Sequence, residues 1–411
     1  MIRQVKILGD GQIWDVKGIS AACPEKTFED LFSGRALGEL AASFDCSRSK
    51  AERVFCRFKE KGKITGVSVT KALLSHHPSA KKQARIILRA LALNGALGIE
   101  ALTRGKGFKK NWPSRQKNYW KGLDLALIGG GVSEGKTGRL LVSLLKEYLS
   151  RDGFSRIRVE QAKFPGKEAG VLGAAAKILA IAAKEARKEG RKKIAVIGLD
   201  LGRDDIGAAL VGIDPKTEQI LKGQKEYCLF NCSLKTPYKK QLKKFLDSRR
   251  NYTKGERELG RRIRAAILEK MARLVGKTEA YARKMGLACS EYIAVAVPGT
   301  TAASSAILNS TDYLPFFRKK DGFNFSRSLE AVLRKKTLHN YRVYIINDGI
   351  AAGLANVNFG LAAARQGKFA FLGVGSGLGG CVGIISHKSK VALRLGSGQA
   401  SHKFKAKIKS F

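Results

Sequence analysis

The chain has 411 residues and lacks several features that would restrict its class. No run of about 18 apolar residues occurs, so the sequence predicts no membrane span. The first residues, MIRQVKILGDG, lack the apolar core of a secretory signal peptide. Only 7 cysteines are present, an odd number without the spacing of a disulfide framework, which favours a reducing compartment. These absences predict a cytoplasmic globular protein, and 44% hydrophobic residues suffice for two domains with cores.

Acidic residues are also scarce. Asp and Glu number 34 against 77 Lys and Arg, which gives a formal net charge of +43 and makes nucleic acid a candidate partner. The basic residues are spread along the chain, so a generally basic surface is the alternative interpretation. The best local candidate is Thr103–Lys121, where cations could bind phosphates and aromatic rings could stack on bases. A solvated surface loop whose rings pack on the body is the competing interpretation.

Hydrophobic periodicity predicts strands and helices that alternate along the chain. The expected strands are a hairpin within the first 22 residues, 123–128, 157–159, 194–199, 206–213, 227–230, 292–297, 341–346, 369–372 and 382–385. Helical patterns cover 26–58, 69–74, 80–102, a segment ending near 149, 167–189, 254–285 and 351–361. This alternation predicts an α/β protein with its ligand site at the ends of the strands.

Three glycine-containing segments are candidate phosphate sites. Asp200 ends a predicted strand beside a turn at Gly202, and a carboxylate there can hold a metal or water against a nucleotide phosphate. A second strand–turn–strand hairpin and a strand–loop–helix segment also carry glycines, which let backbone N–H groups approach a ligand. The residues of these two segments are Gly375, Ser376, Gly377 and Gly379, and Gly129, Gly130 and Gly131.

Taken together, these motifs resemble the ROK family of repressors and sugar kinases, which has the two-lobed actin-like ATPase (ribonuclease H-like) fold. The segments that carry the resemblance are INDGIAA at 346–352, GSGLGG at 375–380, VPG at 297–299, LIGGGVSE at 127–134 and AGVLGAA at 169–175. They cover most of the chain at the spacing of the family. The resemblance implies a glucokinase-like protein that closes on a sugar.

The order of these segments is rotated. In the family the Asp-bearing hairpin comes first and the Gly-Ala-Ala helix last, whereas here that helix runs through Gly190 directly into the hairpin. The resemblance therefore implies a circular permutation with 190–193 as the joining linker, which is reasonable because the termini of a domain are often close together. The first, small lobe would be 166–347, and the second, large lobe would be split into 348–411 and 1–165. The strands at 404–411 and 2–7 would then be neighbours. An error in gene assembly would give the same order.

The resemblance also assigns roles to individual residues. Asp348 would be the general base of an ATP- and Mg²⁺-dependent phosphoryl transfer to a hydroxyl of a hexose or amino sugar. Asn347 would hold the sugar, together with Gln399, His402 and Glu25. The competing interpretation of Asp348 is an N-cap of the helix that follows it.

Three departures from the family separate this chain from a typical kinase. Its zinc motif needs three cysteines and a histidine, but only Cys23 and His402 match, so zinc is expected to be absent. Gln399 replaces a sugar-binding Glu. The first phosphate loop is DLGRDD at 200–205, where Arg203 replaces a glycine and extra carboxylates repel phosphate.

The alternative function is a non-catalytic, sugar-sensing transcriptional regulator that binds DNA. Residues Gly38–Ile64 fit a helix-turn-helix pattern whose second helix would present Ser47–Lys50 to a major groove. The competing interpretation is the ordinary helical region of the second lobe. A monosaccharide is the expected ligand in both cases, and a homodimer is compatible with the resemblance.

Overall fold

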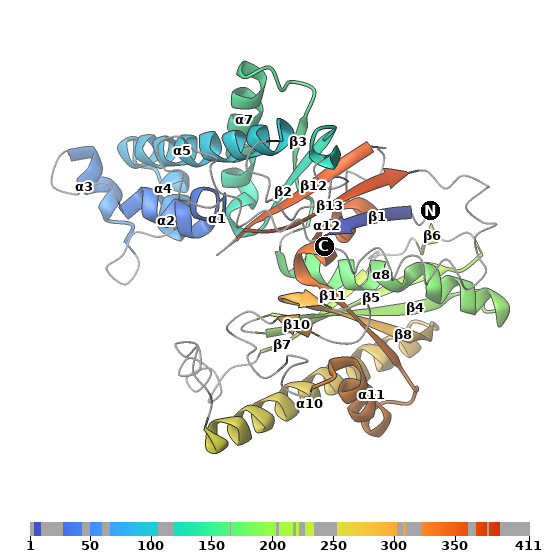
Figure 1. Cartoon of the computed structure of the whole chain (residues 1–411). Helices are drawn as coiled ribbons and strands as arrows, with labels where there is room; N and C mark the ends of the chain where they lie inside the picture. The colour runs from blue at the N-terminus through green and yellow to red at the C-terminus, as the bar shows by residue number, and fades with distance from the viewer. Residues whose placement is uncertain are drawn as a thin grey trace. The chain divides into compact units, whose positions relative to one another are not determined.

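The computed structural model forms two compact units of mixed strands and helices, which confirms the α/β class. Unit 1 comprises Met1–Gln4, Lys167–Ala363 and His387–Ser410, and unit 2 comprises Val5–Gly166, Ala364–Ser386 and Phe411. The structure describes residues 4–9, 28–42, 50–59, 66–105, 118–164, 166–202, 205–216, 219–221, 227–233, 253–301, 307–309, 317, 323–360, 367–375 and 378–386. Figure 1 shows the elements of both units.

Unit 1 is built on a six-stranded sheet. Its strands are β4 (Ile194–Leu201), β5 (Asp205–Asp214), β6 (Gln219–Ile220), β7 (Tyr227–Ser233), β8 (Ala288–Val297) and β11 (Arg342–Asn347). β4 and β5 form an antiparallel hairpin, and β7 and the short β6 pair with β5, also antiparallel. On the other side of β4, β8 and then β11 run parallel to it.

Helices cover both faces of this sheet (Figure 1). α10 (Lys254–Lys284) and α11 (Phe325–Lys336) share a core with Ile197 and Leu199 of β4. α8 (Gly166–Lys188) packs on the opposite face, where a Cβ on Gly198 would lie 2.1 Å from the carbonyl oxygen of Val171. Because side chains alternate along a strand, Asp200 lies on the α8 face with Gly198. α12 (Asp348–Asn358) and the short pair β9 (Thr300–Thr301) and β10 (Ile307–Asn309) complete the described elements of unit 1.

Unit 2 is built on a five-stranded sheet with the order β1-β13-β12-β2-β3. Its strands are β1 (Gln4–Gly9), β2 (Leu125–Gly129), β3 (Arg158–Gln161), β12 (Gly367–Val374) and β13 (Leu378–Ser386). β12 and β13 form an antiparallel hairpin, whereas β2 and then β3 run parallel to β12. β1 is thus a neighbour of β13. The second half of the predicted N-terminal hairpin and the predicted strand 404–411 lie outside the described residues.

A helical core accompanies the sheet of unit 2. Its elements are α1 (Phe28–Leu31), α2 (Gly34–Ala42), α3 (Lys50–Cys56), α4 (Gly66–Leu74), α5 (Pro78–Thr103), the 3₁₀ turn η2 (Gly131–Ser133) and α7 (Gly135–Arg151). Leu37 of α2 and Phe55 of α3 are fully buried in the same core as Leu88 of α5. Within the described residues α5 alone is long and apolar enough to cross a membrane, and 61% of its apolar window is buried in the unit, as in the central helix of a globular domain.

The two sheets share one strand order. In unit 1 the hairpin strands β4 and β5 lie at the centre of the sheet. β7 pairs with β5, whereas β8 and then β11 lie on the other side of β4. Unit 2 repeats this with β12 and β13 as the hairpin, β1 beyond β13, and β2 and β3 beside β12. The orders match, but in unit 2 the strands that complete the sheet come earlier in the chain than the hairpin.

Two features were not predicted from the sequence. α11 was missed, although Asn324 accepts a hydrogen bond from the Arg327 N–H as its N-cap and three basic residues lie in its last turn, both ordinary helix signals. The cysteine spacing also gave no sign of a disulfide, yet Cys56 is disulfide-bonded. Cys289 and Cys381 are buried and form no disulfide with any residue that the structure describes.

Candidate functional site

Asn347 ends β11 and fixes the start of α12. Its Oδ1 accepts a hydrogen bond from the Ile350 N–H at 3.0 Å, and its Nδ2 donates to the Gly299 carbonyl oxygen at 3.0 Å. Gly299 has φ 93°, a left-handed conformation that glycine adopts without strain. The Asn347 amide therefore joins α12 to the turn after β8, and both of its ends are engaged within the unit.

Asp348 is the first residue of α12, and its side chain is exposed. Its Oδ1 accepts a hydrogen bond from the Gly349 N–H at 2.8 Å. The N-cap is Asn347, so the interpretation of Asp348 as the cap is wrong. A carboxylate in the first turn is favoured as an anion by the helix dipole, and an anionic, exposed carboxylate can accept a proton from a hydroxyl that reaches it.

The first turn of α12, which carries Asp348, packs closely against α8. A Cβ on Gly173 of α8 would lie 1.6 Å from the Ala351 carbonyl oxygen of α12, so only glycine permits this approach. Each of these helices follows the last parallel strand of a sheet: α12 follows β11, and α8 follows β3. The crossing fixes the turn of α12 that carries Asp348.

Asp200 lies near the end of β4, opposite Gly207 of β5. Its carboxyl group packs against α8, where a Cβ on Gly170 would lie 2.6 Å from the carboxyl carbon. The Gly202 N–H donates to the Asp205 carbonyl oxygen at 3.0 Å and closes the β4–β5 turn. Residues 203 and 204 of this loop lie outside the described part of the chain. Unit 1 thus presents a carboxylate, held by α8, at the end of its hairpin.

The hairpin of unit 2 ends in a different environment, made of backbone from three segments. The Gly34 N–H, at the start of α2, donates to the Gly375 carbonyl oxygen at 2.7 Å, and a Cβ on Gly34 would lie 2.3 Å from that oxygen. Gly130, with φ 83°, packs against the backbone of Val374, which a Cβ would approach to 2.7 Å. Three glycine-containing segments therefore meet within hydrogen-bond or van der Waals distance. Those of Gly130 and Gly375 were predicted as phosphate sites, whereas Gly34 was not among the predicted site residues.

The loop after β2 is held by polar contacts. Gln161 Nε2 donates to the Ser133 carbonyl oxygen at 2.5 Å, and Ser133 Oγ donates to the Gly130 carbonyl oxygen at 2.8 Å. A Cβ on Gly129 would lie 2.5 Å from the Phe371 ring, so this glycine serves packing. Around Gly131 a Cβ would meet nothing within 4 Å. Gly131 is the glycine of this loop with open space beside it.

Several predicted site residues cannot be placed. Ser376, Gly377, Gln399, His402, Glu25 and Cys23 lie outside the described residues. Gly379 is placed in β13, opposite Gly373 of β12, with nothing within 4 Å of an added Cβ. Across the described ranges no group of three or more His, Cys, Asp or Glu side chains is arranged to hold a metal ion.

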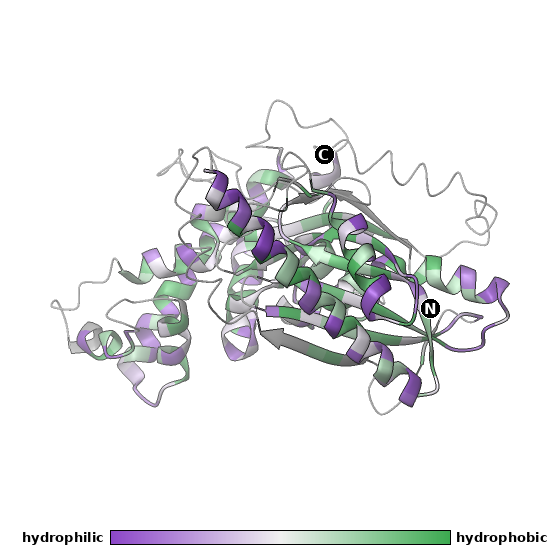
Figure 2. Ribbon diagram, turned by 90° about the horizontal axis from the view of Figure 1, so that it is seen from below, coloured by the Kyte–Doolittle hydropathy of each residue, from purple (hydrophilic) through white to green (hydrophobic). Residues whose placement is uncertain are grey.

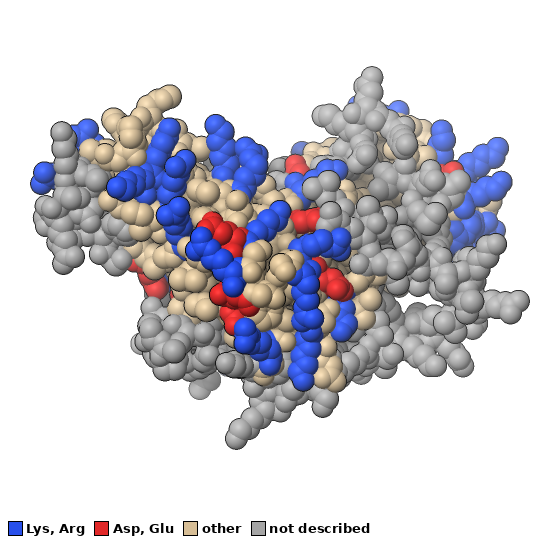
Figure 3. Space-filling model, turned by 90° about the horizontal axis from the view of Figure 1, so that it is seen from above, with Lys and Arg blue, Asp and Glu red and all other residues tan. Residues whose placement is uncertain are grey.

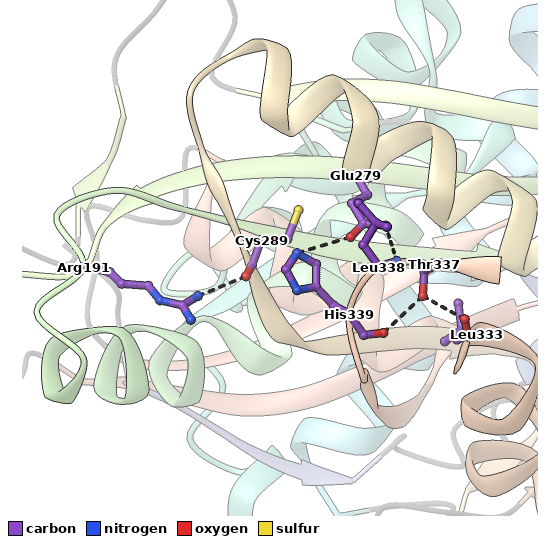
Figure 4. A network of polar contacts seen from close by, with 7 residues as sticks. All are labelled: Arg191, Glu279, Cys289, Leu333, Thr337, Leu338 and His339. Carbon is purple, nitrogen blue, oxygen red and sulfur yellow. Dashed lines mark hydrogen bonds and ion pairs between the residues drawn. The ribbon is translucent and has the colours of Figure 1, made fainter. Parts of the chain in front are cut away.

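A polar network that the sequence did not reveal joins α10 to the segment between α11 and β11 (Figure 4). Glu279 is only 2% exposed, and its Oε1 lies 3.2 Å from His339 Nε2, an ion pair when the imidazole is protonated. Its Oε2 accepts a hydrogen bond from the Leu338 N–H at 3.4 Å. Thr337 Oγ1 lies 2.8 Å from the Leu333 carbonyl oxygen and 3.1 Å from that of His339.

This network is structural in character. Burial raises the pKa of the nearby Cys289 thiol to about 11, so at neutral pH the thiol is protonated and a poor nucleophile. Burial likewise raises the pKa of the Tyr341 hydroxyl. Arg191 Nη1 donates to the Cys289 carbonyl oxygen at 3.3 Å and so ties the α8–β4 connection to the start of β8. We assign the network to holding the helices of unit 1 on their sheet.

Among the α8 cations whose side chains the structure describes, Lys177 is the one with a clearly shifted pKa. Burial of its side chain lowers its pKa to about 8. It lies one helical turn beyond Gly173, so it follows the α8–α12 crossing on the same side of the helix. Its ammonium therefore charges and discharges near physiological pH.

Comparison with known proteins adds no assignment, since no protein-family model matches the chain and no curated protein matches it. The ROK resemblance consequently depends on the five sequence motifs.

Proposed function

We propose that this chain is an ATP-dependent sugar kinase of the ROK type, with an actin-like ATPase fold in circularly permuted order. The observation that carries the proposal is the shared strand order of the two sheets, each with an antiparallel hairpin at its centre and parallel strands beside it. A repeated topology of this kind is what the resemblance to a two-lobed fold implies. It supports the family assignment independently of the motifs.

The chain order of the strands supports the permutation. In unit 1 the five matched strands follow one another as β4, β5, β7, β8 and β11. In unit 2 the matching order is β12, β13, β1, β2 and β3, which becomes consecutive only if the chain is read as a circle. α8 then runs into β4 through residues 189–193, where the family would have its two termini. A circular permutation would account for both the strand order of unit 2 and the direct connection from α8 to β4.

A nucleotide site at the end of the unit 2 hairpin is supported by its glycines. Gly34 and Gly130 lie against the backbone of residues 374 and 375, and glycines at such positions let backbone N–H groups approach a ligand. In unit 1 the carboxylate of Asp200 would hold Mg²⁺, which prefers oxygen ligands. Bound ATP supplies the transferable phosphoryl group in this proposal. Arg203, in the turn of the unit 1 hairpin, remains the main departure from the family.

Asp348 is the proposed general base. Its carboxylate would take the proton of a sugar hydroxyl as that oxygen attacks the phosphoryl group. Asn347 would act chiefly by fixing α12, because its amide is already engaged at Oδ1 and Nδ2. Gln399, His402 and Glu25 are the proposed sugar ligands.

The proposal is tested by ADP release from ATP and Mg²⁺ over a panel of hexoses and amino sugars. We expect turnover on at least one sugar, reduced about 100-fold or more in Asp348→Asn because the base is lost. Asp152→Asn, which alters an exposed aspartate at the end of α7, is the matched control and should retain activity. No turnover on any sugar, with sugar-induced thermal stabilisation retained, would contradict the kinase and favour the sugar-sensing regulator.

A further inference from the structure

α10 and α11 form a basic surface on unit 1. α10 is 31 residues long and spans about 46 Å. In Figure 2, seen from below, it lies in front of the sheet of unit 1 and alternates hydrophilic and hydrophobic residues. We call the outward cations of these helices the α10–α11 basic face: Arg262, Arg273, Lys277 and Lys284 of α10, and Arg334, Lys335 and Lys336 of α11. All seven side chains are exposed.

Every carboxylate of the two helices is already engaged. Glu256 closes the capping box with Thr253, Glu279 is buried against His339, and Glu330 accepts a hydrogen bond from the Val343 N–H. The two remaining carboxylates pair with basic residues of the surface: Glu258 with Arg261 and Arg262, and Glu269 with Arg273 and Lys336.

Cations remain after these pairs are counted. Lys277, Lys284, Arg334 and Lys335 form no ion pair with any residue that the structure describes. Even the paired arginines stay accessible, with Arg262 76% and Arg273 69% exposed. The surface therefore carries uncompensated positive charge, which an external anion would neutralise.

The geometry favours an extended polyanion. Arg262, Arg273, Lys277 and Lys284 lie on one side of α10 over about 33 Å of helix. Duplex DNA carries one negative charge per about 1.7 Å of axis, so a duplex segment of this length holds about 20 phosphate charges in its two strands together. Between the cations this side of α10 carries the small residues Ala266 and Ala280 and the paired Glu269, and the larger exposed apolar side chains, Tyr281, Met285 and Leu338, lie toward its C-terminal end.

We propose that the α10–α11 basic face binds the phosphate backbone of nucleic acid without reading its sequence. Lysines and arginines on a helix surface contact phosphates and release counterions, and contacts to phosphate carry no sequence information. The proposal is independent of the kinase activity, since none of these residues belongs to the candidate site. It differs from a helix-turn-helix in unit 2 by its location and by its lack of specificity.

The test compares two variants with the same change in charge. Lys277→Glu/Lys284→Glu/Lys335→Glu reverses the α10–α11 basic face, and Lys82→Glu/Arg85→Glu/Arg89→Glu reverses exposed cations of α5 in unit 2. Figure 3 shows that Lys and Arg also gather over the helices of that unit, so the second variant controls for overall charge. Fluorescence anisotropy with a short mixed-sequence duplex is measured at rising salt, after circular dichroism has confirmed folding.

We expect the first variant to bind the duplex about 100-fold more weakly, and the slope of the logarithm of its binding constant against the logarithm of salt concentration to fall by about 3 in magnitude. The α5 variant should change little in both quantities. Equal losses in both variants would overturn the proposal in favour of bulk charge, and absence of duplex binding by the unaltered chain would also overturn it. Binding to anionic vesicles that only the first variant loses, with duplex binding unchanged, would assign the surface to a membrane instead. If the Glu variant fails to fold, the Lys→Ala triple at the same positions replaces it.

Discussion

The two hairpins at the centres of the sheets have the same topology but different surroundings. At the end of β4 a carboxylate, Asp200, packs against Gly170 of α8. At the end of β12 the neighbours are backbone groups, since Gly375 accepts from Gly34 and Val374 touches Gly130. One topology thus supports a carboxylate site in unit 1 and a backbone-lined site in unit 2. In the proposed kinase, the carboxylate of unit 1 would hold the cation and the backbone of unit 2 would contact the phosphate.

The largest expected effect is a loss of stability when a glycine at a close backbone contact within either unit is replaced by alanine. Gly173→Ala would place a Cβ 1.6 Å from the Ala351 carbonyl oxygen, and Gly138→Ala would place one 1.7 Å from that of Ser133. Each should lower the free energy of unfolding by more than about 4 kcal/mol, because backbone must move. Gly38→Ala, with nothing within 4 Å, should instead stabilise the chain by up to about 1 kcal/mol.

Chemical denaturation with hydrogen exchange resolved by segment measures this prediction. Gly173→Ala should deprotect β4 and α12 in unit 1 first, whereas Gly138→Ala should deprotect β2 and α7 in unit 2. Uniform loss of protection over both units in either variant would contradict their description as separate compact bodies.

The next effect concerns α8, the helix that follows the last parallel strand of unit 2. Below pH 8 Lys177 is charged in both states, so the cost of burying the ammonium is fully present. As pH rises from about 8 to 10.5 the folded state loses its proton first, the unfolded state binds more protons, and stability rises. Lys177→Met should therefore stabilise the chain below pH 8, by up to about 3 kcal/mol, and this advantage should shrink toward pH 10.5.

Urea unfolding of both proteins across this pH range provides the measurement. Lys184→Met, an exposed lysine of the same helix, is the control and should show no such pH-dependent difference. A constant difference between Lys177→Met and the unaltered chain at every pH would show that the lysine is not desolvated.

A third prediction compares the two sites by nucleotide affinity. Gly34→Ala would push a Cβ to 2.3 Å from the Gly375 carbonyl oxygen and separate the segments of the backbone-lined site. We expect at least a tenfold loss in ATP affinity by calorimetry, about 1.4 kcal/mol or more. Gly202→Ala, whose Cβ would come no closer than 3.1 Å to Asp205, should change affinity less than threefold. The reverse ranking would place the phosphate contacts in unit 1.

The smallest expected effect is a gain of function in the unit 1 hairpin. Arg203→Gly restores the residue that the ROK resemblance implies for this phosphate loop and removes a side chain from the approach to phosphate. We expect the rate of sugar-dependent ADP release to rise about tenfold or less. A decrease would indicate that Arg203 itself contacts the phosphate, which an Arg203→Lys variant with retained activity would support.

Much of the fold could be predicted because its strands are short apolar runs bounded by glycine. β4 and β5 were expected at 194–199 and 206–213 and lie at Ile194–Leu201 and Asp205–Asp214. The pairing of strands that are distant in the sequence is harder to predict. Hydrophobic periodicity indicates which face of a strand is buried, but it does not indicate which strand lies next to it. The position of β1 beside β13 and the contact between Gly34 and Gly375 therefore emerged only from the structure.

The candidate site was predictable to a similar extent. Asp348 and Asn347 were singled out from their sequence context, but the cap was considered only at Asp348, and the hydrogen bond from the Ile350 N–H assigns it to Asn347. The network around Glu279 was not predictable, since a lone Glu within a basic helix gives no sign that it is buried. Its partner His339 lies 60 positions further along the chain.

The most direct test of the central claim is the transfer of the terminal phosphate of ATP to a sugar. The chain is incubated with isotopically labelled ATP, Mg²⁺ and a mixture of hexoses and amino sugars, and the sugars are analysed by mass spectrometry. We predict one labelled sugar phosphate with the unaltered chain, none above background with Asp348→Asn, and normal yield with Asp152→Asn. Labelled inorganic phosphate alone, or equal product from Asp348→Asn, would contradict the assignment of Asp348 as the base of a sugar kinase.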